Sequence, residues 1–131
     1  MTRKYTLKKH ERLKSQKQLD KLFSGSQSRF KYPLKLIYLL EESDEGEWPM
    51  LFSISVPKKK VKSAVKRNLI KRRVRESYRL NKNALQEHIF TLGNIKLSMM
   101  FIFIENHPID FKKIDHSVKA LLLHLTNEIN S

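Results

Sequence analysis

Residues 62–82 constrain the fold of this chain more than any other segment. They carry nine lysines and arginines but only one acidic residue, Glu76. Like charges three or four residues apart on a helix repel each other, so a free helix of this composition is unfavourable. The segment therefore needs an apolar anchor on one side and negative charge opposite the other. At about 100° per residue, one arc holds the residues that can pack on a core: Ile70, Val74, Ser77 and Tyr78.

A second arc of the same helix is polar and almost entirely cationic. Charged faces that only meet solvent usually alternate in sign. A rigid stripe of one sign instead fits a row of phosphates, which indicates nucleic acid binding. A membrane-surface helix would need large apolar residues along its whole other side, and here that side is needed for the core. The stripe consists of Asn68, Lys71, Arg72, Arg75 and Arg79, with Arg67 in the first turn and Lys58, Lys59 and Lys60 in the preceding loop.

The formal charge of the whole chain, +14 from 27 basic and 13 acidic residues, also favours a polyanionic partner. The absence of cysteine excludes disulfides, thiol catalysis and cysteine-ligated zinc. The longest apolar run, residues 97–104, is far too short to span a membrane. With no apolar signal at the start, the sequence predicts a cytoplasmic protein. Its 131 residues predict a single domain, 1–131, and its charge predicts that this domain binds nucleic acid; the basic segment 1–14 is expected to order only against a partner.

Periodicity predicts an α/β fold, with helices packed on a small sheet in a two-layer α+β sandwich. The order is helix, strands, long helix, strand, helix. The acidic stretch 41–47 is interpreted as a hairpin loop between two strands. Ser15, Ser63 and Asp110 are the expected helix N-caps. The expected helices are 15–23, 63 to about 80, a short piece within 81–90, and one from about 111; the expected strands are 34–40, 50–56 and 95–104.

Two further groups of residues admit a functional and a structural interpretation. Leu19, Phe23 and Tyr38 beside small polar residues such as Ser55 can floor a groove for single-stranded RNA. From spacing alone, these apolar side chains are better explained as core. Glu105, His107 and Asp110 can hold a divalent metal, although a proline-containing turn with a helix cap explains them more simply. No P-loop, nucleotide fingerprint or Ser/His/Asp motif occurs.

The segment VPKKKVKSAVKRNLIKRRVRESYRL, residues 56–80, resembles the signature of the bacterial ribonuclease P protein subunit. That family shows a Lys-Lys pair, a short spacer and an Arg-Asn-Arg-x-x-Arg-like series on a long helix. The core of the motif here is Arg67, Asn68, Lys71, Arg72 and Arg75. The upstream ERLKSQKQLDKLFSG and the chain length also fit, and the likeness extends over roughly residues 10 to 104.

The resemblance implies a subunit of an endoribonuclease that removes 5′ leaders from precursor tRNA. The catalytic RNA would hold the Mg²⁺ ions and do the chemistry, so this chain would carry no catalytic residue, cofactor or metal. One protein would bind one RNA through the motif helix. The fold would be ribosomal-protein-S5-domain-2-like, with a left-handed βαβ crossover. The leader would lie in a cleft between the first helix and the sheet, beside Leu19, Phe23, Tyr38 and Ser55, with Arg67 at its edge.

Two residues depart from the family pattern. Leu69 stands where an arginine is common, which puts one RNA contact in doubt. Leu19 stands where phenylalanine is common in the first helix, which weakens stacking on a leader base. The alternative function is a non-enzymatic RNA-binding protein, such as a ribosomal component, and a metal-dependent protein nuclease ranks third.

Overall fold

The structure, a computed structural model, describes residues 12–13, 15–43 and 48–129. Most of the basic segment 1–14, and residues 44–47, lie outside the described ranges. The mixed α/β class predicted from the sequence is confirmed. The described elements are α1 Gln16–Gly25, β1 Gln27–Lys31, β2 Leu34–Glu42, β3 Met50–Ser55, α2 Ala64–Asn81, α3 Asn83–Leu92, β4 Ile95–Phe103 and α4 Phe111–Glu128.

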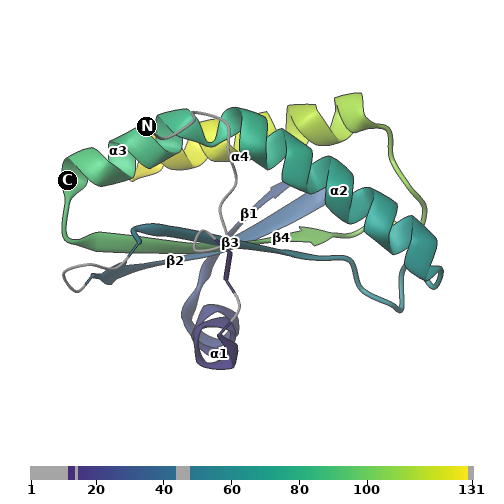
Figure 1. The fold of residues 1–131 in the computed structure, drawn as a ribbon, viewed down its shortest axis with the longest axis horizontal. Helices are drawn as coiled ribbons and strands as arrows, with labels where there is room; N and C mark the ends of the chain where they lie inside the picture. The colour runs from purple at the N-terminus through teal and green to yellow at the C-terminus, as the bar shows by residue number, and fades with distance from the viewer. Residues whose placement is uncertain (1–11, 14, 44–47, 130–131) are drawn as a thin grey trace.

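The four strands form one sheet in the order β1-β2-β4-β3. β2 is antiparallel to both β1 and β4, whereas β3 and β4 are parallel. Figure 1 shows α2, α3 and α4 on one face of the sheet and α1 alone on the other. This division gives the sheet one thickly covered face and one face that a single short helix only partly covers. No helix in the described ranges is long and apolar enough to cross a membrane.

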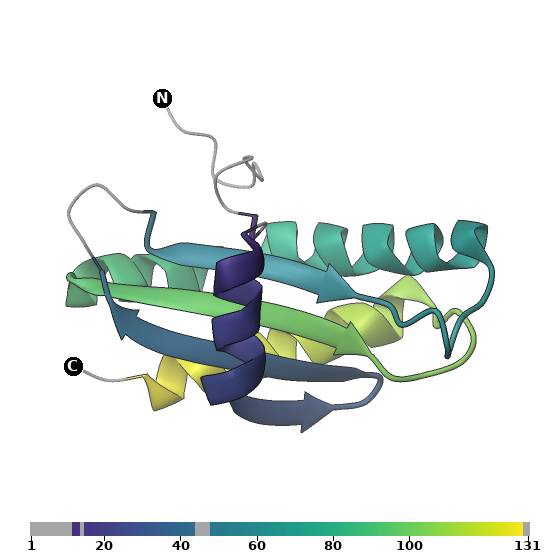
Figure 2. The ribbon, with the colours of Figure 1, turned by 90° about the horizontal axis from the view of Figure 1, so that it is seen from below.

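The connection between the parallel strands β3 and β4 has the rare hand. The chain leaves β3, runs through α2 and α3 behind the sheet and returns to β4, as can be followed in Figure 2. This crossover is left-handed, although parallel βαβ units are right-handed in nearly all proteins. The left-handed crossover implied by the resemblance is thereby confirmed. It places α2 over the β3 edge of the sheet.

The predicted hairpin around residues 41–47 is wrong. β2 and β3 do not pair with each other, because β4 lies between them and bonds to both. β4 is a nearly continuous apolar run that is buried along almost its whole length, so a central position suits it best. The sequence does not predict β1, because four of its five residues are exposed and show no apolar alternation.

All three predicted N-caps are confirmed. The hydroxyl of Ser63 accepts a hydrogen bond from the backbone N–H of Lys66 at 3.2 Å, and Ser15 caps α1 in the same way. The Asp110 carboxylate accepts from the N–H of Lys113 at 2.9 Å. Each cap satisfies one of the backbone donors that the first turn of a helix leaves unpaired.

The two sheet faces carry separate apolar clusters. The large core lies beneath α2, α3 and α4, and β2 contributes Leu34, Leu36 and Tyr38 to it. A small cluster lies beneath α1, where Leu22 meets Ile37 and Met100. Alternate residues of a strand point to opposite faces, so neighbours in β2 belong to different clusters.

Asp115 joins α2 to α4 through a compact polar contact. Its carboxylate accepts from the Ser77 hydroxyl at 2.6 Å and from the Asn81 amide at 3.0 Å, and it pairs with Lys119 at 3.1 Å. Burial alone would raise the pKa of Asp115, but the bonds from Ser77, Lys119 and Asn81 together hold it below its ordinary value of 3.8.

We expect Asp115→Asn to lower the free energy of unfolding by about 1.5 kcal/mol at neutral pH, because the variant has no charged acceptor at this position. A lowered folded-state pKa gives stability that is present above the unfolded value and lost as pH falls through the folded value. The difference between wild type and variant should therefore be constant above about pH 5 and shrink below about pH 4. Urea unfolding across this range measures it. A difference independent of pH would show that the carboxylate charge is unimportant.

Candidate RNA interface

The apolar arc of α2 fixes which side of this helix faces outward. Ile70, Val74, Ser77 and Tyr78 are its buried residues, as predicted. The Tyr78 ring stacks on Phe52 of β3, with centroids 4.1 Å apart and planes 18° from parallel. The helix is thus held against rotation, which gives the side chains on its polar arc fixed starting points.

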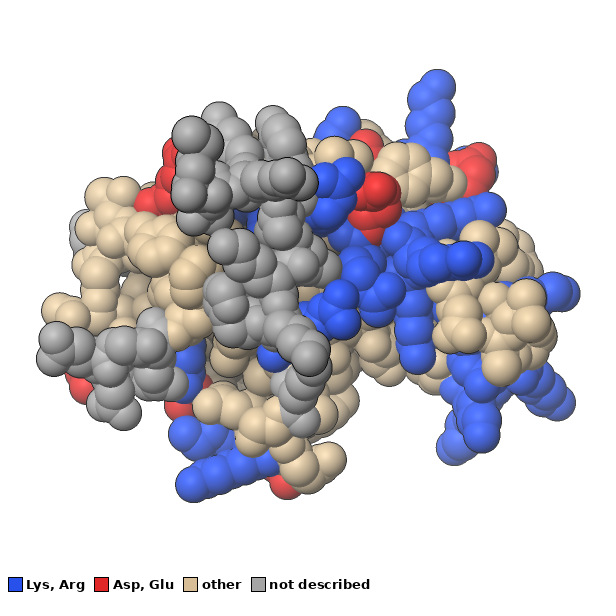
Figure 3. Space-filling view, viewed as in Figure 1, with Lys and Arg blue, Asp and Glu red and all other residues tan. Residues whose placement is uncertain are grey.

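Four of the stripe residues surround one hollow on the outer surface of α2. The hollow has a volume of about 440 Å³ and is lined by Asn68, Lys71, Arg72 and Arg75, together with Val65. Figure 3 shows lysines and arginines gathered over α2 and toward the end of the molecule where α2 begins. We call Asn68, Lys71, Arg72 and Arg75 the α2 stripe. The prediction that these four residues lie on one side of the helix is confirmed, because all four line the same hollow.

The α2 stripe continues over the β3 edge toward the other face of the sheet. A second hollow of about 180 Å³ lies between α2 and β3, and Lys71 and Arg75 line it together with Arg12 and Ser53. Burial lowers the pKa of Arg75, and the charge of Arg12 lowers it further. The guanidinium remains protonated at neutral pH, since arginine loses its proton only under strongly basic conditions. No ion pair within the described ranges engages Lys71, Arg72 or Arg75, so their charge is available to an external anion.

Other predicted cations of this helix have different surroundings. Arg79 forms an ion pair with Glu76 at 2.6 Å, which reduces its charge toward a ligand. Arg67 donates to the carbonyl oxygens of Val61 and Lys62 at 2.9 and 2.8 Å and thereby holds the loop before α2. Lys58, Lys59 and Lys60 are exposed in that loop, beside the start of the helix.

The prediction that Tyr38 shares a surface with Leu19 and Phe23 is wrong. Tyr38 is buried on the α4 face of the sheet, where its hydroxyl contacts Glu128 at 2.9 Å. Leu19 packs in the cluster beneath α1, and Phe23 stands 62% exposed on the same helix. The error has a simple cause: Tyr38 is two residues from Leu36 and one from Ile37, so strand alternation sends it to the core face.

The face of the sheet that α1 partly covers carries a row of four strand residues, Phe30, Lys35, Ile102 and Ser55, which we call the platform. They lie directly opposite one another across the sheet, from β1 to β3. Ile102 shares its face with the α1 cluster, so the whole row points to the α1 side. Figure 2 shows that α1 crosses the strands near their middle and leaves this end uncovered. Within the row, Phe30 is 62% exposed.

Sequence reasoning predicts only Ser55 of this platform row. Phe30 lies on the unpredicted strand β1, and Lys35 and Ile102 reach the row through the register with β2 and β4. The alternation of β2, with Leu34 and Leu36 inward, is a signal that could have assigned Lys35 to the opposite face. The neighbours of Ser55 depend on strand order, which sequence spacing does not contain.

The turn that contains Glu105, His107 and Asp110 is built by local hydrogen bonds. Glu105 accepts from the Tyr32 hydroxyl, and His107 contacts Asn106 at 2.8 Å, while Asp110 caps α4. The Tyr32 bond is the main cause that lowers the pKa of Glu105. In the described ranges, no group of three histidine or acidic side chains could hold a metal ion. The contacts of these three residues are therefore those of a turn that ends in a helix cap.

Comparison with known sequences places the chain in one family. A sequence model of the family described as Ribonuclease P matches residues 7–126. The chain is 29% identical over 127 residues to the ribonuclease P protein component of Porphyromonas gingivalis, which covers 97% of this chain and 91% of the relative. It is 38% identical over 77 residues to that of Ectopseudomonas mendocina, covering 59% of this chain and 55% of the relative.

Solved structures show the same fold. The ribonuclease P protein of Staphylococcus aureus superposes with a TM-score of 0.66 at 19% identity, covering 92% of this chain and 98% of that one. The protein from Thermotoga maritima gives 0.63 at 21% identity, covering 92% and 99%. The match of the family model to nearly the whole chain, and not these distant structural likenesses, decides membership: the chain belongs to the ribonuclease P protein family.

Proposed function

We propose that this chain is the protein subunit of ribonuclease P and binds the catalytic RNA of that enzyme through the α2 stripe. The observation that carries this proposal is the hollow formed by Asn68, Lys71, Arg72 and Arg75 on a helix whose rotation is fixed by its buried side. Phosphates in this hollow would neutralise the mutual repulsion of cations that lack ion-pair partners in the described part of the chain. Lys58, Lys59 and Lys60 extend the same charge beyond the start of α2.

The platform is the proposed site for the 5′ leader of precursor tRNA. Phe30 offers an exposed ring for base stacking, Lys35 offers a charge for a phosphate and Ser55 offers a hydroxyl. Leu19 packs in the α1 cluster together with Ile102 of the platform, and Phe23 is exposed on the same helix, so α1 lies beside the platform. The hollow between α2 and β3 contains Ser53 as well as Lys71 and Arg75, so the two surfaces are continuous around the β3 edge.

Cleavage in this proposal belongs to the RNA subunit. That RNA would hold the Mg²⁺ ions that activate the attacking water, and this chain would supply binding and orientation in the cytoplasm, one protein per RNA. The sequence offers Glu105 and Asp110 as the candidate metal-binding carboxylates of this chain. Glu105 accepts a hydrogen bond from the Tyr32 hydroxyl, and Asp110 caps the first turn of α4. Neither belongs to the α2 stripe or to the platform.

Reconstitution tests the proposed function. The purified protein is combined with its cognate catalytic RNA, precursor tRNA and Mg²⁺, and leader removal is followed on a gel. We expect the protein to accelerate leader removal at low Mg²⁺ and to release no leader without the RNA subunit. A protein that binds RNA but leaves this reaction unchanged would instead support the non-enzymatic alternative.

We expect Phe30→Ala to weaken the binding of precursor tRNA by about 1–3 kcal/mol, because one base no longer has its aromatic partner. Mature tRNA lacks the leader, so its binding should not change. Phe90→Ala is the matched control, since Phe90 is 50% exposed but lies on α3, on the other side of the sheet. Equilibrium binding of both tRNAs to the reconstituted enzyme measures the difference. Equal weakening for precursor and mature tRNA would exclude the platform as the leader site.

A further inference from the structure

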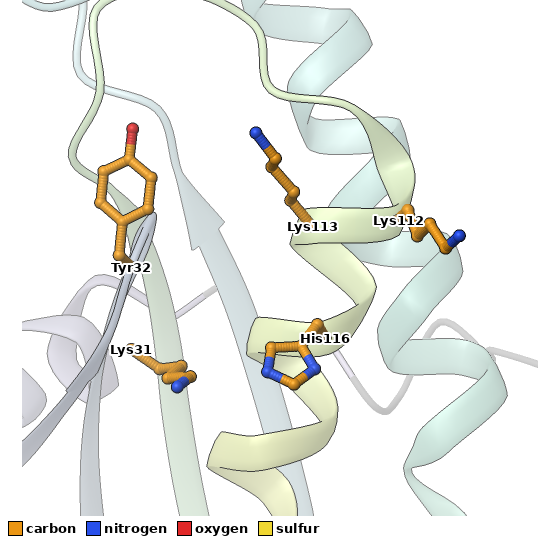
Figure 4. A pocket seen from close by; sticks show the side chains of 5 residues that line it. All are labelled: Lys31, Tyr32, Lys112, Lys113 and His116. Atoms are coloured by element: carbon orange, nitrogen blue, oxygen red, sulfur yellow. The ribbon is translucent and has the colours of Figure 1, made fainter.

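A pocket outside both proposed surfaces lies between the end of β1 and the first turns of α4. Its volume is about 450 Å³, and it is lined by Lys31, Tyr32, Lys112, Lys113 and His116. In Figure 4, Tyr32 and Lys113 extend on either side of the opening, and Lys31 and His116 lie across the gap from each other below them. Lys112 points away from the gap on the far side of α4. We call Lys31, Tyr32, Lys113 and His116 the α4 pocket.

No ion pair within the described part of the chain engages the lysines around the α4 pocket, Lys31, Lys112 and Lys113, and the carboxylate at its wall, Glu105, accepts from the Tyr32 hydroxyl. Two of these lysines belong to the first turn of α4, which contains no acidic residue. Cations are disfavoured at this end of a helix, where the backbone already presents positive partial charge. The Asp110 carboxylate before the helix already accepts from the backbone N–H of Lys113. An external anion would relieve this crowding.

Tyr32 adds an aromatic wall to this cationic pocket. Its side chain is about half exposed, and its hydroxyl is tied to Glu105 in the turn after β4. That bond fixes the ring from a second element. A fixed ring beside cations is the combination that binds nucleotides of single-stranded nucleic acid, since the base or ribose packs on the ring while the phosphate meets the charge.

The α4 pocket and the α2 stripe lie over opposite edges of the sheet. α4 packs on β1 and β2, whereas α2 packs on β3. With the strand order β1-β2-β4-β3, three interstrand spacings, about 14 Å, separate these edges. The body of the helical layer stands between the two sites, so one short stretch of RNA on the α2 stripe does not also fill the α4 pocket.

We propose that the α4 pocket binds a backbone phosphate, with its nucleotide against Tyr32, from an RNA segment distinct from the one on the α2 stripe. The inference rests on the proposed function and extends it by a second point of RNA contact. The phosphate belongs either to the catalytic RNA or to the precursor tRNA. The chemistry of recognition is the same for both.

The test compares Lys31→Ala/Lys113→Ala with the control Lys17→Ala/Lys66→Ala, which removes the same charge from exposed positions outside both sites. Binding to the catalytic RNA alone, and binding of precursor tRNA to the preformed protein–RNA complex, are the two arms. We expect the pocket pair to weaken binding tenfold or more relative to the control in one arm. Weakening in the first arm identifies the catalytic RNA as the source, and weakening confined to the second identifies precursor tRNA.

Further variants distinguish an effect of the α4 pocket from an effect of net charge, and a failure of this inference from a failure of the proposed function. Tyr32→Ala should weaken binding in the same arm at least threefold, whereas Tyr32→Phe should weaken it less, because phenylalanine keeps the ring that packs on the nucleotide and loses only the bond to Glu105 that fixes it. Equal behaviour of pocket and control pairs in both arms, with unchanged thermal melts, overturns the inference. Arg72→Ala/Arg75→Ala is measured alongside: if it weakens binding while the pocket pair does not, only the α4 pocket is excluded. If the wild-type protein does not bind the catalytic RNA, the proposed function itself fails.

Discussion

Replacing Arg72 and Arg75 together with alanine is expected to weaken binding to the catalytic RNA about 100-fold. Both side chains line the hollow on α2, and neither has an ion-pair partner in the described ranges. A charge-assisted hydrogen bond at a solvent-accessible site contributes about 1.5 kcal/mol, so removing two such bonds amounts to roughly two decades of affinity. The slope of log affinity against log salt should also fall by about 0.7–0.9 for each phosphate that the variant no longer neutralises.

A charge-matched control shows whether position or net charge matters. Lys66 and Arg73 also lie on α2, away from the stripe, but Arg73 is unsuitable because it donates to the Ile109 carbonyl at 2.6 Å and supports the fold. Lys17→Ala/Lys66→Ala removes the same charge from two exposed side chains. We expect this pair to lower affinity only slightly. If both pairs weakened binding equally and changed the salt slope equally, binding would depend on the total positive charge and not on the position of the α2 stripe.

Tyr38→Ala is expected to lower the free energy of unfolding by about 3–5 kcal/mol, the range observed when large buried aromatic residues are truncated. Its side chain is only 3% exposed, and its hydroxyl bonds to Gln27 at 3.0 Å and to Glu128 at 2.9 Å. The truncation would leave a cavity beneath α4 and release a contact between the sheet and the end of that helix. Urea unfolding followed by circular dichroism measures the change.

Tyr38→Phe separates the ring from the hydroxyl. It keeps the packing and removes the bonds to Gln27 and Glu128, so a cost of about 1 kcal/mol is expected. Neither Tyr38 variant should affect precursor tRNA selectively over mature tRNA once it is folded, because the side chain is on the far side of the sheet from the platform. If a stably folded Tyr38→Ala protein bound precursor tRNA more weakly but mature tRNA unchanged, Tyr38 would belong to the leader-binding site after all.

The different outcomes for the two predicted surfaces follow from how far apart their residues are in the sequence. The α2 stripe comes from one helix, whose period of about 3.6 residues fixes which side chains share a side. The buried and polar arcs of α2 can therefore be assigned from the sequence. The predicted leader cleft combines residues of one helix and several strands. Which side chains lie together there depends on strand order and register, as Phe30 and Lys35 of the platform illustrate.

The sequence by itself determined the elements whose stability is local or strongly patterned. It determined the capped helices α1, α2 and α4, the alternating and apolar strands, and the cationic arc of α2. Only the tertiary structure decided that β4 separates β2 from β3, that Tyr38 faces α4, and that Lys31 and Lys113 line the same pocket. The physical reason is that local hydrogen bonds and side-chain periodicity act within one element, whereas pairing partners are selected by the burial of the whole apolar surface at once.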